Sequence, residues 1–536
     1  MLAIRRFVAK RSYSFVTTPI FYVNAAPHVG HVYSAVLADA LHRWHRIQGK
    51  SPAIFSTGTD EHGLKVQHAA ASQNMDPQLF CDDVSRLFKK LFNAYDVSYN
   101  DYVRTTERRH VECVEYFWNR LAANGWLYKD SYEGWYSVSD ETFVGKSQVT
   151  QFDDEHGNQC MVSTETGNVV EWTKEENYMF RLSHFKEQLL SWLNCHSAAV
   201  YPSVYATEVK EFVSNGLADL SVSRQSSRLQ WGIPVPNDPS QMIYVWLDAL
   251  VNYLTVAGYP HNNFHWPPTH HIVGKDIVKF HAIYWPAFLM AVGLDPPKRV
   301  VVHAHWTRDT LKMSKSRGNV VDPFDNLRHW GSDVIRYYLL KDGSLHRDSD
   351  YCDDRIASSL NGDLADSLGN LLQRCTAPSL NPSQSVPPLP DVDRMTREDK
   401  TVMDAMNRLC DTVPKLFDHL EFNKGLEAII NCLHIANQYF THARPWTMAG
   451  DPSSRDRLNI ILLLPIEVLR LCGLLLLPVI PNAAERMLNR LGVPVAARNA
   501  DFIKCCLNEP TAFVNCYGVE CALDGDMSVL FRKVKI

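Results

Sequence analysis

A chain of 536 residues is longer than one hydrophobic core usually supports, so about three or four domains are expected. The composition, 46% hydrophobic and 21% charged, is typical of a soluble protein. A formal net charge of −5 excludes a cationic field over the whole molecule, so any contact with nucleic acid must come from local basic patches.

The N-terminal residues differ from the rest of the chain in charge. They carry four basic side chains, from Arg5 to Arg11, and no acidic residue occurs before Asp39. A basic, serine-containing and acid-free start is typical of an organelle transit peptide. The alternative is a frayed basic arm on a cytosolic enzyme. We predict a transit peptide over 1–14.

Strands and helices alternate in the next stretch. Residues 15–18 are predicted as a buried strand, and apolar residues at helical spacing predict a helix from 28–31 to about Gly49. Residues 52–55 read as a second strand, followed by a loop over 57–63. This alternation predicts a parallel sheet covered by helices on both faces.

The alternation returns after an interruption. Residues 271–273 and 300–302 are predicted strands, with a helix over 280–292 between them. Between the two halves, 130–235 is first aromatic and strand-like and then helical. We interpret that stretch as an insertion that splits a nucleotide-binding fold.

Long helical patterns dominate from about residue 355, interrupted by a proline-rich linker over 382–390, and predict a helical bundle. The most apolar stretch, Ile460 to Ile480, contains Pro465, Glu467 and Arg470. These residues favour a buried helix with one polar face over a membrane span, so no membrane partner is expected.

The thirteen cysteines include no C-x-x-C spacing. This pattern argues against a disulfide framework and against a zinc knuckle, and it suits a reducing compartment.

The first motif with chemical meaning is His28-Val29-Gly30-His31. It lies where a strand and loop lead into a helix, and a helix N-terminus attracts phosphate. Gly30 lets a flat ring approach the backbone, and both histidines can donate hydrogen bonds to phosphate oxygens. The alternatives are two surface histidines or half of a metal site.

The second motif is Lys312-Met313-Ser314-Lys315-Ser316. Two lysines at this spacing can neutralise a departing polyphosphate. Either motif alone also fits a non-functional alternative, which for this motif is a solvated basic loop. The chain has no G-x-x-x-x-G-K-[ST] and no G-x-G-x-x-G, so it does not read as a P-loop ATPase or a dinucleotide dehydrogenase. In this order and separation, the two motifs predict one ATP site built from both halves.

Together with the stretches between them, these motifs resemble the methionyl-tRNA synthetases of class I, and the mitochondrial type fits best. The leucyl, valyl and isoleucyl enzymes share the two motifs but resemble the intervening chain less. The stretches that carry the resemblance are 16–24 (VTTPIFYVN), 57–63 (TGTDEHG), 244–249 (YVWLDA), 274–277 (GKDI) and 280–286 (FHAIYWP).

The resemblance implies an α/β fold, with a Rossmann-like parallel-sheet catalytic domain split by a connective insertion and followed by an all-α anticodon-binding helical bundle. The implied divisions are 15–129 and 236–325 for the catalytic halves, 130–235 for the insertion without zinc, 326–375 for a stem-contact region and 376–536 for the anticodon-binding domain.

The resemblance also implies the site residues. His28, His31, Lys312 and Lys315 would be catalytic, and Gly30, Gly274, Asp276 and Ser314 would join them in binding ATP. Asp60 would hold the α-ammonium of methionine, in a pocket made of Ile20, Tyr22, Trp246, Ala249, Tyr253, Phe280, His281 and Trp285. Aromatic rings suit a polarizable thioether, and a carboxylate suits an ammonium group. Core packing is the alternative for Trp246 and Trp285, and a loop or cap carboxylate is the alternative for Asp60.

Two departures from the family concern metal and assembly. Many methionyl enzymes carry zinc knuckles made of paired cysteines, but the insertion here contains only Cys160 and Cys195, so no structural zinc is expected. The additional C-terminal dimerisation module of some bacterial relatives is also missing, which favours a monomer.

In the helical region the resemblance assigns anticodon binding to Asn370, Arg374 and Trp446. Such side chains read unpaired bases by hydrogen bonding and stacking, although Trp446 also fits a helix-end core position.

The implied activity is ATP-dependent ligation of L-methionine to tRNA(Met) through methionyl-adenylate, with Mg²⁺, in the mitochondrial matrix. The alternatives are another class I synthetase for an aliphatic amino acid and a non-catalytic RNA-binding protein derived from a synthetase.

Overall fold

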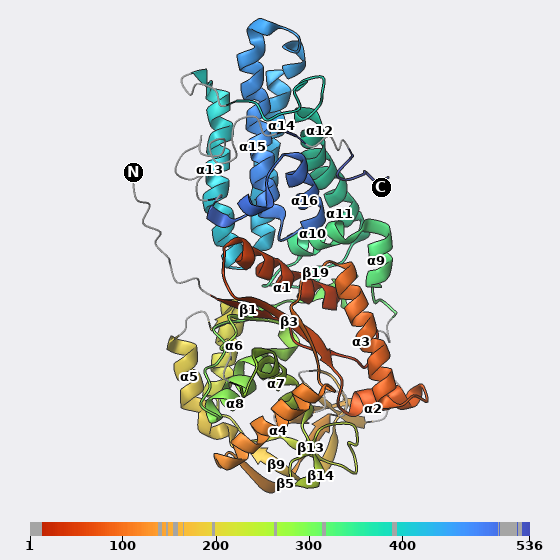
Figure 1. The fold of residues 1–536 in the computed structure, drawn as a ribbon. Helices are drawn as coiled ribbons and strands as arrows, with labels where there is room; N and C mark the ends of the chain where they lie inside the picture. Colours follow the sequence, from red (N-terminus) through yellow and green to blue (C-terminus); the bar gives the residue numbers. More distant parts are fainter. Residues whose placement is uncertain are drawn as a thin grey trace, which may run out of the picture.

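The computed structural model describes residues 13–137, 142–145, 148–153, 159–164, 166–195, 199–261, 265–313, 318–388, 394–501, 503, 522–523 and 528–535. The α/β part of the chain occupies one end of the molecule, and a bundle of long helices stands on it (Figure 1).

A parallel sheet forms the centre of the α/β part. Its strands lie in the order β10-β16-β15-β1-β3-β2, and β4 also pairs with β3. Strands such as β1 and β16 are buried along their whole length, as expected for a parallel sheet with both faces covered. The strands are β1 (Ser14–Thr17), β2 (Phe21–Tyr22), β3 (Ala53–Asp60), β4 (Asp101–Arg104), β10 (Val200–Tyr201), β15 (His270–Gly274) and β16 (Val300–His303).

Helices from both halves cover this sheet. Figure 1 shows α1 (Val29–Ile47) above the sheet and α7 (Val245–Ala257) below it. Strand β1, from the first half, lies between β3 and β15, so the two halves share one sheet. The other helices of this part are α2 (Leu64–Ser72), α3 (Pro77–Ala94), α4 (Arg108–Ala123) and α8 (Trp285–Ala291), the last preceded by a π-helical segment (Phe280–Tyr284).

The prediction of a loop over 57–63 is wrong for its first four residues. Strand β3 continues to Asp60, because Thr57 and Thr59 are buried and pair with β4. Gly58 marks a close approach of two strands. A Cβ added there would lie 1.9 Å from the Val103 carbonyl oxygen.

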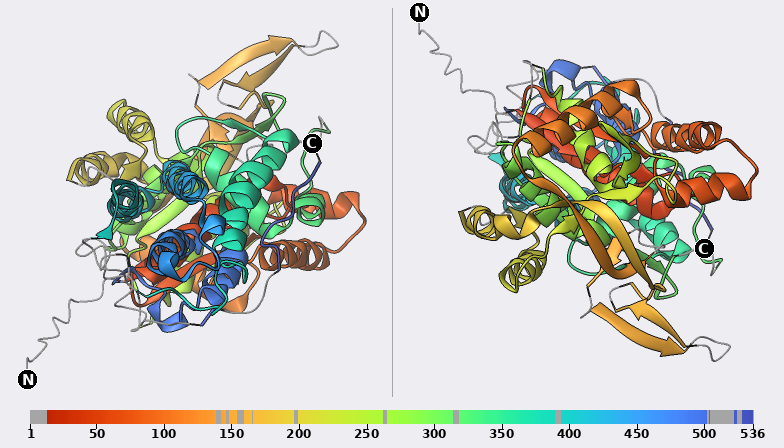
Figure 2. Two further views of the ribbon diagram at one scale, coloured as in Figure 1. Left: turned by 90° about the horizontal axis from the view of Figure 1, so that it is seen from above. Right: turned by 90° about the horizontal axis from the view of Figure 1, so that it is seen from below.

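The stretch between the halves forms an antiparallel ribbon and two helices. Strands β5 (Leu127–Ser137) and β9 (Glu171–Phe180) pair along most of their length, and Trp135 packs edge-on against Trp172. The hairpin of β7 (Val149–Asp153) and β8 (Gln159–Ser163) projects from the body (Figure 2). The remaining elements are β6 (Thr142–Val144), α5 (Lys186–Cys195), α6 (Ser203–Ser214), β11 (Leu220–Ser221), β12 (Ser223–Gln225), β13 (Pro234–Val235) and β14 (Asp238–Ile243).

The C-terminal part is helical. A small sheet of β17 (Trp306–Arg308), β18 (Leu311–Lys312) and β19 (Ser349–Asp350) lies at its start. Its helices are α9 (Pro323–Trp330), α10 (Ser332–Asp342), α11 (Asp353–Ser358), a π-helical segment (Ser359–Gly369), α12 (Asn370–Cys375), α13 (Arg397–Asp418), α14 (Phe422–Ala443), α15 (Arg455–Leu476) and α16 (Pro481–Arg490).

Helix α15 is the apolar helix noted in the sequence. The segment Pro452–Leu476 is long and apolar enough to cross a membrane, but 94% of an apolar 18-residue stretch within it is buried inside the protein. The prediction of a buried helix is confirmed, but its polar side chains do not face solvent. Glu467 and Arg470 are both buried and form an ion pair of 2.7 Å.

Polar contacts join the bundle to the α/β part through α1. Arg336 of α10 is fully buried and donates to Asp39 of α1 at 2.6 Å, and also to the carbonyl oxygens of Pro478 and Val479 at 2.9 Å each. Further along α1, the Trp44 indole donates to Asp418 of α13 at 2.8 Å. These contacts fix the bundle against α1, the helix that begins directly after His28.

Candidate active site at the carboxyl ends of the central strands

A cavity of about 870 Å³ lies where β1, β3, β15 and β16 end. Ligands of open α/β sheets bind at this edge. The cavity brings together predicted residues from both halves of the chain, namely Ile20, Tyr22, His28, Gly30, His31, Asp60, Trp246, Ala249, Tyr253, Gly274, Asp276, Phe280 and His281.

The first motif closes the N-terminus of α1. His28 is the cap residue, and the Gly30 amide donates to its Nδ1 at 3.1 Å. In turn, the His28 amide donates to Nδ1 of His31 at 3.0 Å. Since both Nδ1 atoms accept, each neutral ring carries its proton on Nε2, where it can donate to an anion. A Cβ on Gly30 would lie 2.9 Å from the His28 ring, so only glycine fits this arrangement.

Aromatic side chains form the opposite wall. The rings of Trp246 and Phe280 are stacked, with centroids 3.7 Å apart and planes 9° from parallel. Behind them, the Tyr253 hydroxyl lies 2.8 Å from Nε2 of His281, whose Nδ1 lies 3.0 Å from the Ile277 carbonyl oxygen. Burial lowers the pKa of His281 to about 4, so the ring is neutral at pH 7. Its Nδ1–H donates to the carbonyl, and its Nε2 accepts from the tyrosine.

Trp285 does not line the cavity, in contrast to its predicted role as a pocket wall. It is fully buried on α8, with its ring 6.0 Å from Tyr253 and 6.1 Å from Phe117. The alternative of core packing therefore describes its position, since it supports Tyr253 from behind.

The end of β16 contributes residues that the sequence analysis missed. Nε2 of His303 lies 2.8 Å from the Ser34 hydroxyl, and Nδ1 lies 2.9 Å from the Ala304 carbonyl oxygen. Next to it, His305 is 3.3 Å from the Asp276 carboxylate. Both histidines could have been predicted from their position at the end of a buried parallel strand, because ligand-binding side chains gather there.

The second motif is described only in part. Lys312 ends β18, and Met313 lines the cavity. The side chain of Lys312, as well as Ser314 and Lys315, lie outside the described residues.

The three predicted anticodon residues lie on the helical bundle. Asn370 and Arg374 are one turn apart on α12, and Arg374 donates to the Thr441 hydroxyl of α14 at 3.1 Å. Trp446 follows the end of α14 and is 51% exposed, so it is not a core residue.

Within the ranges that the structure describes, no group of three or more histidine, cysteine or acidic side chains is placed to hold a metal ion. Cys160 and Cys195 of the insertion are free thiols.

Comparisons with known proteins agree with this geometry. Residues 14–376 match the family described as "tRNA synthetases class I (M)", and residues 389–509 match the "Anticodon binding domain of methionyl tRNA ligase".

Two relatives are named "Methionine--tRNA ligase, mitochondrial". The Homo sapiens protein is 47% identical over 96% of this chain and 88% of its own length, and the Mus musculus protein is 46% identical over 97% and 92%. A solved structure of the Mycobacterium tuberculosis methionyl-tRNA synthetase, in complex with methionyl-adenylate, is similar with a TM-score of 0.89 and 37% identity, covering 97% of this chain and 99% of that one. The chain therefore belongs to the class I methionyl-tRNA synthetases.

Proposed function

We propose that the protein ligates L-methionine to tRNA(Met), using ATP and passing through methionyl-adenylate. The observation that carries this proposal is the cavity itself, which unites a helix N-terminus capped by two histidines, a carboxylate and a stacked aromatic wall. Each of these features suits one part of the reactants.

The amino acid would bind between Asp60 and the aromatic wall. The Asp60 carboxylate pairs with the α-ammonium, and Trp246, Phe280 and Tyr253 surround the thioether. An apolar pocket separates substrates that differ by one methylene by only about 1–3 kcal/mol, so selectivity depends on how closely these rings fit the side chain.

The chemistry requires no protein nucleophile. The methionine carboxylate attacks the α-phosphorus of ATP in line and pyrophosphate departs, so positioning and charge stabilisation supply the rate. His28 and His31 would donate from Nε2 to the α-phosphate, while Lys312 and Lys315 would neutralise the pyrophosphate.

Mg²⁺ would neutralise additional phosphate charge when it is bound. This ion uses substrate phosphates with one or two carboxylates, and Asp276, with its side chain 54% exposed beside the cavity, fits that requirement.

In the second step, the 2′-hydroxyl of the terminal adenosine of the tRNA attacks the activated carbonyl and releases AMP. Asn370, Arg374 and Trp446 would bind the anticodon, and the exposed indole of Trp446 is available for stacking on a base.

The acid-free N-terminal residues 1–14 and the mitochondrial relatives support a place in the mitochondrial matrix, with cleavage of a transit peptide. We also propose that the enzyme acts as a monomer.

Amino-acid-dependent exchange of pyrophosphate into ATP, tested over the twenty amino acids, checks the first step. Charging of mitochondrial and cytosolic tRNA preparations checks the second. Exchange with methionine alone is expected. Exchange with an aliphatic amino acid instead, or with none, would favour one of the two alternative functions.

A further inference from the structure

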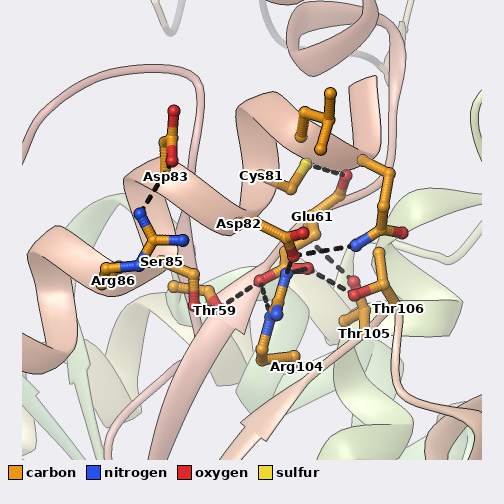
Figure 3. A network of polar contacts seen from close by, with 12 residues as sticks. Thr59, Glu61, Cys81, Asp82, Asp83, Ser85, Arg86, Arg104, Thr105 and Thr106 are labelled. Atoms are coloured by element: carbon orange, nitrogen blue, oxygen red, sulfur yellow. Dashed lines mark hydrogen bonds and ion pairs between the residues drawn. The ribbon is translucent and has the colours of Figure 1, made fainter. Parts of the chain in front are cut away.

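The segment that carries Asp60 is anchored by the residue after it. Asp60 ends β3 and lines the cavity, whereas Glu61 is fully buried and does not line it. Figure 3 shows the Glu61 side chain directed into a cluster of polar groups from β4, α3 and the segment after β4. Because successive side chains of extended backbone point to opposite faces, a Glu61 held in this cluster turns Asp60 toward the cavity.

The Glu61 carboxylate is fully engaged by donors. Its Oε1 accepts from Nε of Arg104 and from the Thr59 hydroxyl, both at 2.7 Å. Its Oε2 accepts from Nη2 of Arg104 at 2.9 Å and from the Thr106 hydroxyl at 2.5 Å. The Glu61 amide donates to the Thr105 hydroxyl at 2.9 Å. Two N–H groups of one guanidinium and two hydroxyl donors together fix the Glu61 carboxylate in one orientation.

Arg104 is itself held in place. It ends β4, where its backbone pairs with Thr59, and its Nη2 also donates to Asp82 of α3. The Arg104 side chain is 22% exposed, and Glu61 is fully buried. A lysine could keep the charge at this position but could not reproduce the planar, two-pronged contact.

A second anchor holds the other side of the segment. Nδ1 of His62 lies 2.7 Å from the Asp248 carboxylate, whose second oxygen lies 2.7 Å from Nε2 of His110. Asp248 is on α7, which also carries Trp246 of the aromatic wall, so a change in this anchor could reach the wall through that helix. The Arg104 anchor approaches from outside the pocket, and it can be changed without touching the aromatic wall.

We propose that Arg104 is a positioning residue for the Asp60 carboxylate and acts through Glu61. This inference rests on the proposed function, because it requires that Asp60 pairs with the ammonium group of methionine. Its signature is a loss of affinity confined to ligands that carry this ammonium group.

Three ligands test the proposal with purified full-length Arg104→Lys enzyme. Methionine and methioninol both carry the ammonium, and 4-(methylsulfanyl)butanoate lacks it but keeps the thioether. In pyrophosphate exchange, the KM for methionine and the inhibition constant of methioninol are expected to rise about tenfold, equivalent to about 1.4 kcal/mol. The KM for ATP and the inhibition constant of 4-(methylsulfanyl)butanoate are expected to stay within about twofold, because neither ligand contacts Asp60.

Arg109→Lys is the matched control. Arg109 also makes a two-pronged contact with a carboxylate, from Nη1 and Nη2 to Asp101 at 2.8 and 2.7 Å, but neither Arg109 nor Asp101 lines the cavity. Its constants are expected to equal those of the wild type.

If Arg104→Lys does not fold, as judged by circular dichroism, Thr106→Val removes one hydroxyl from Glu61 and is expected to produce the same pattern at about threefold. Equal changes for ligands with and without the ammonium, or no change in any constant, would overturn the role of Arg104. Absence of methionine-dependent exchange in the wild type would instead refute the proposed function.

Discussion

Replacing Arg336 with methionine tests the buried contact between α1 and the bundle. Arg336 and Asp39 are both fully buried, and Arg336 also donates to three carbonyl oxygens, those of Tyr95, Pro478 and Val479. Methionine keeps most of the apolar stem and removes the charge. Breaking a buried ion pair from one side costs about 3–5 kcal/mol.

The lower end of that range is expected, because Asp39 keeps other partners. Nε of Arg43 lies 2.8 Å from its carboxylate, and the Ser98 amide and hydroxyl donate to it at 2.7 and 2.6 Å. Burial opposes ionisation of Asp39, yet Arg336, Arg43 and Ser98 together lower its pKa below the usual value. The Asp39 carboxylate therefore stays charged and buried after Arg336 is replaced. We expect the free energy of unfolding to fall by about 3 kcal/mol as a result.

Urea unfolding, followed by fluorescence and circular dichroism, measures this loss. Arg355→Met is the control, since Arg355 is 57% exposed and 3.9 Å from Asp342, and such surface pairs contribute about 0–1 kcal/mol. The double variant Arg336→Met with Asp39→Asn is expected to lose less stability than the sum of the two single losses, because the two side chains interact directly in the wild type. A single variant that unfolds at the same urea concentration as the control would refute the reasoning.

Three other predictions concern activity and pH. Asp418→Ala removes the acceptor of the Trp44 indole, so kcat/KM for tRNA charging is expected to fall about three- to tenfold while pyrophosphate exchange stays unchanged. Asp411→Ala, on the exposed side of the same helix, is the control. Equal loss of both activities would contradict a role of Asp418 in domain placement. Lys315→Ala is expected to slow exchange at least tenfold, about 1.4 kcal/mol, with little change in methionine affinity, and an unaltered exchange rate would remove Lys315 from the mechanism. Burial lowers the pKa of His42 and of His303 to about 4, so both rings stay neutral in the folded protein and bind protons on unfolding. As the pH falls from about 6.5 to 4, each ring is expected to reduce the free energy of unfolding by about 1.4 kcal/mol per pH unit. Equal urea midpoints at pH 7 and pH 5 would contradict this.

The sequence predicted the elements whose signals are local. Helix α1 and the strands on either side of the insertion follow from apolar spacing, and the structure has them within a few residues of the predicted positions. The continuation of β3 through Gly58 could not be predicted in this way. It depends on the approach of Val103, a residue of another strand.

The same limit applies to the site. The resemblance assigned His28, Asp60 and Phe280 to one site, and the structure brings them to one cavity, since each lies at the end of a strand or near the start of a helix. Nothing in the local sequence distinguishes Trp285, which packs behind Tyr253, from Trp246, which faces the cavity. Glu467 and Arg470 illustrate the converse. Two charged residues predict a polar face, but their mutual contact and the bonds from Arg470 to the Leu491 carbonyl oxygen allow both to be buried.

The place of β1 between β3 and β15 has a consequence for the order of folding. Thr17 of β1 bonds to Nδ1 of His271 of β15 at 2.7 Å across 254 positions of sequence. Contacts at such separation form slowly, because a long loop must close before they contribute. A nascent chain therefore holds an unpaired edge of β1 until the residues around 270 have been synthesised, and an unpaired edge recruits other strands. Assembly of the central sheet therefore waits for the second half of the catalytic domain, which supplies β15 and β16.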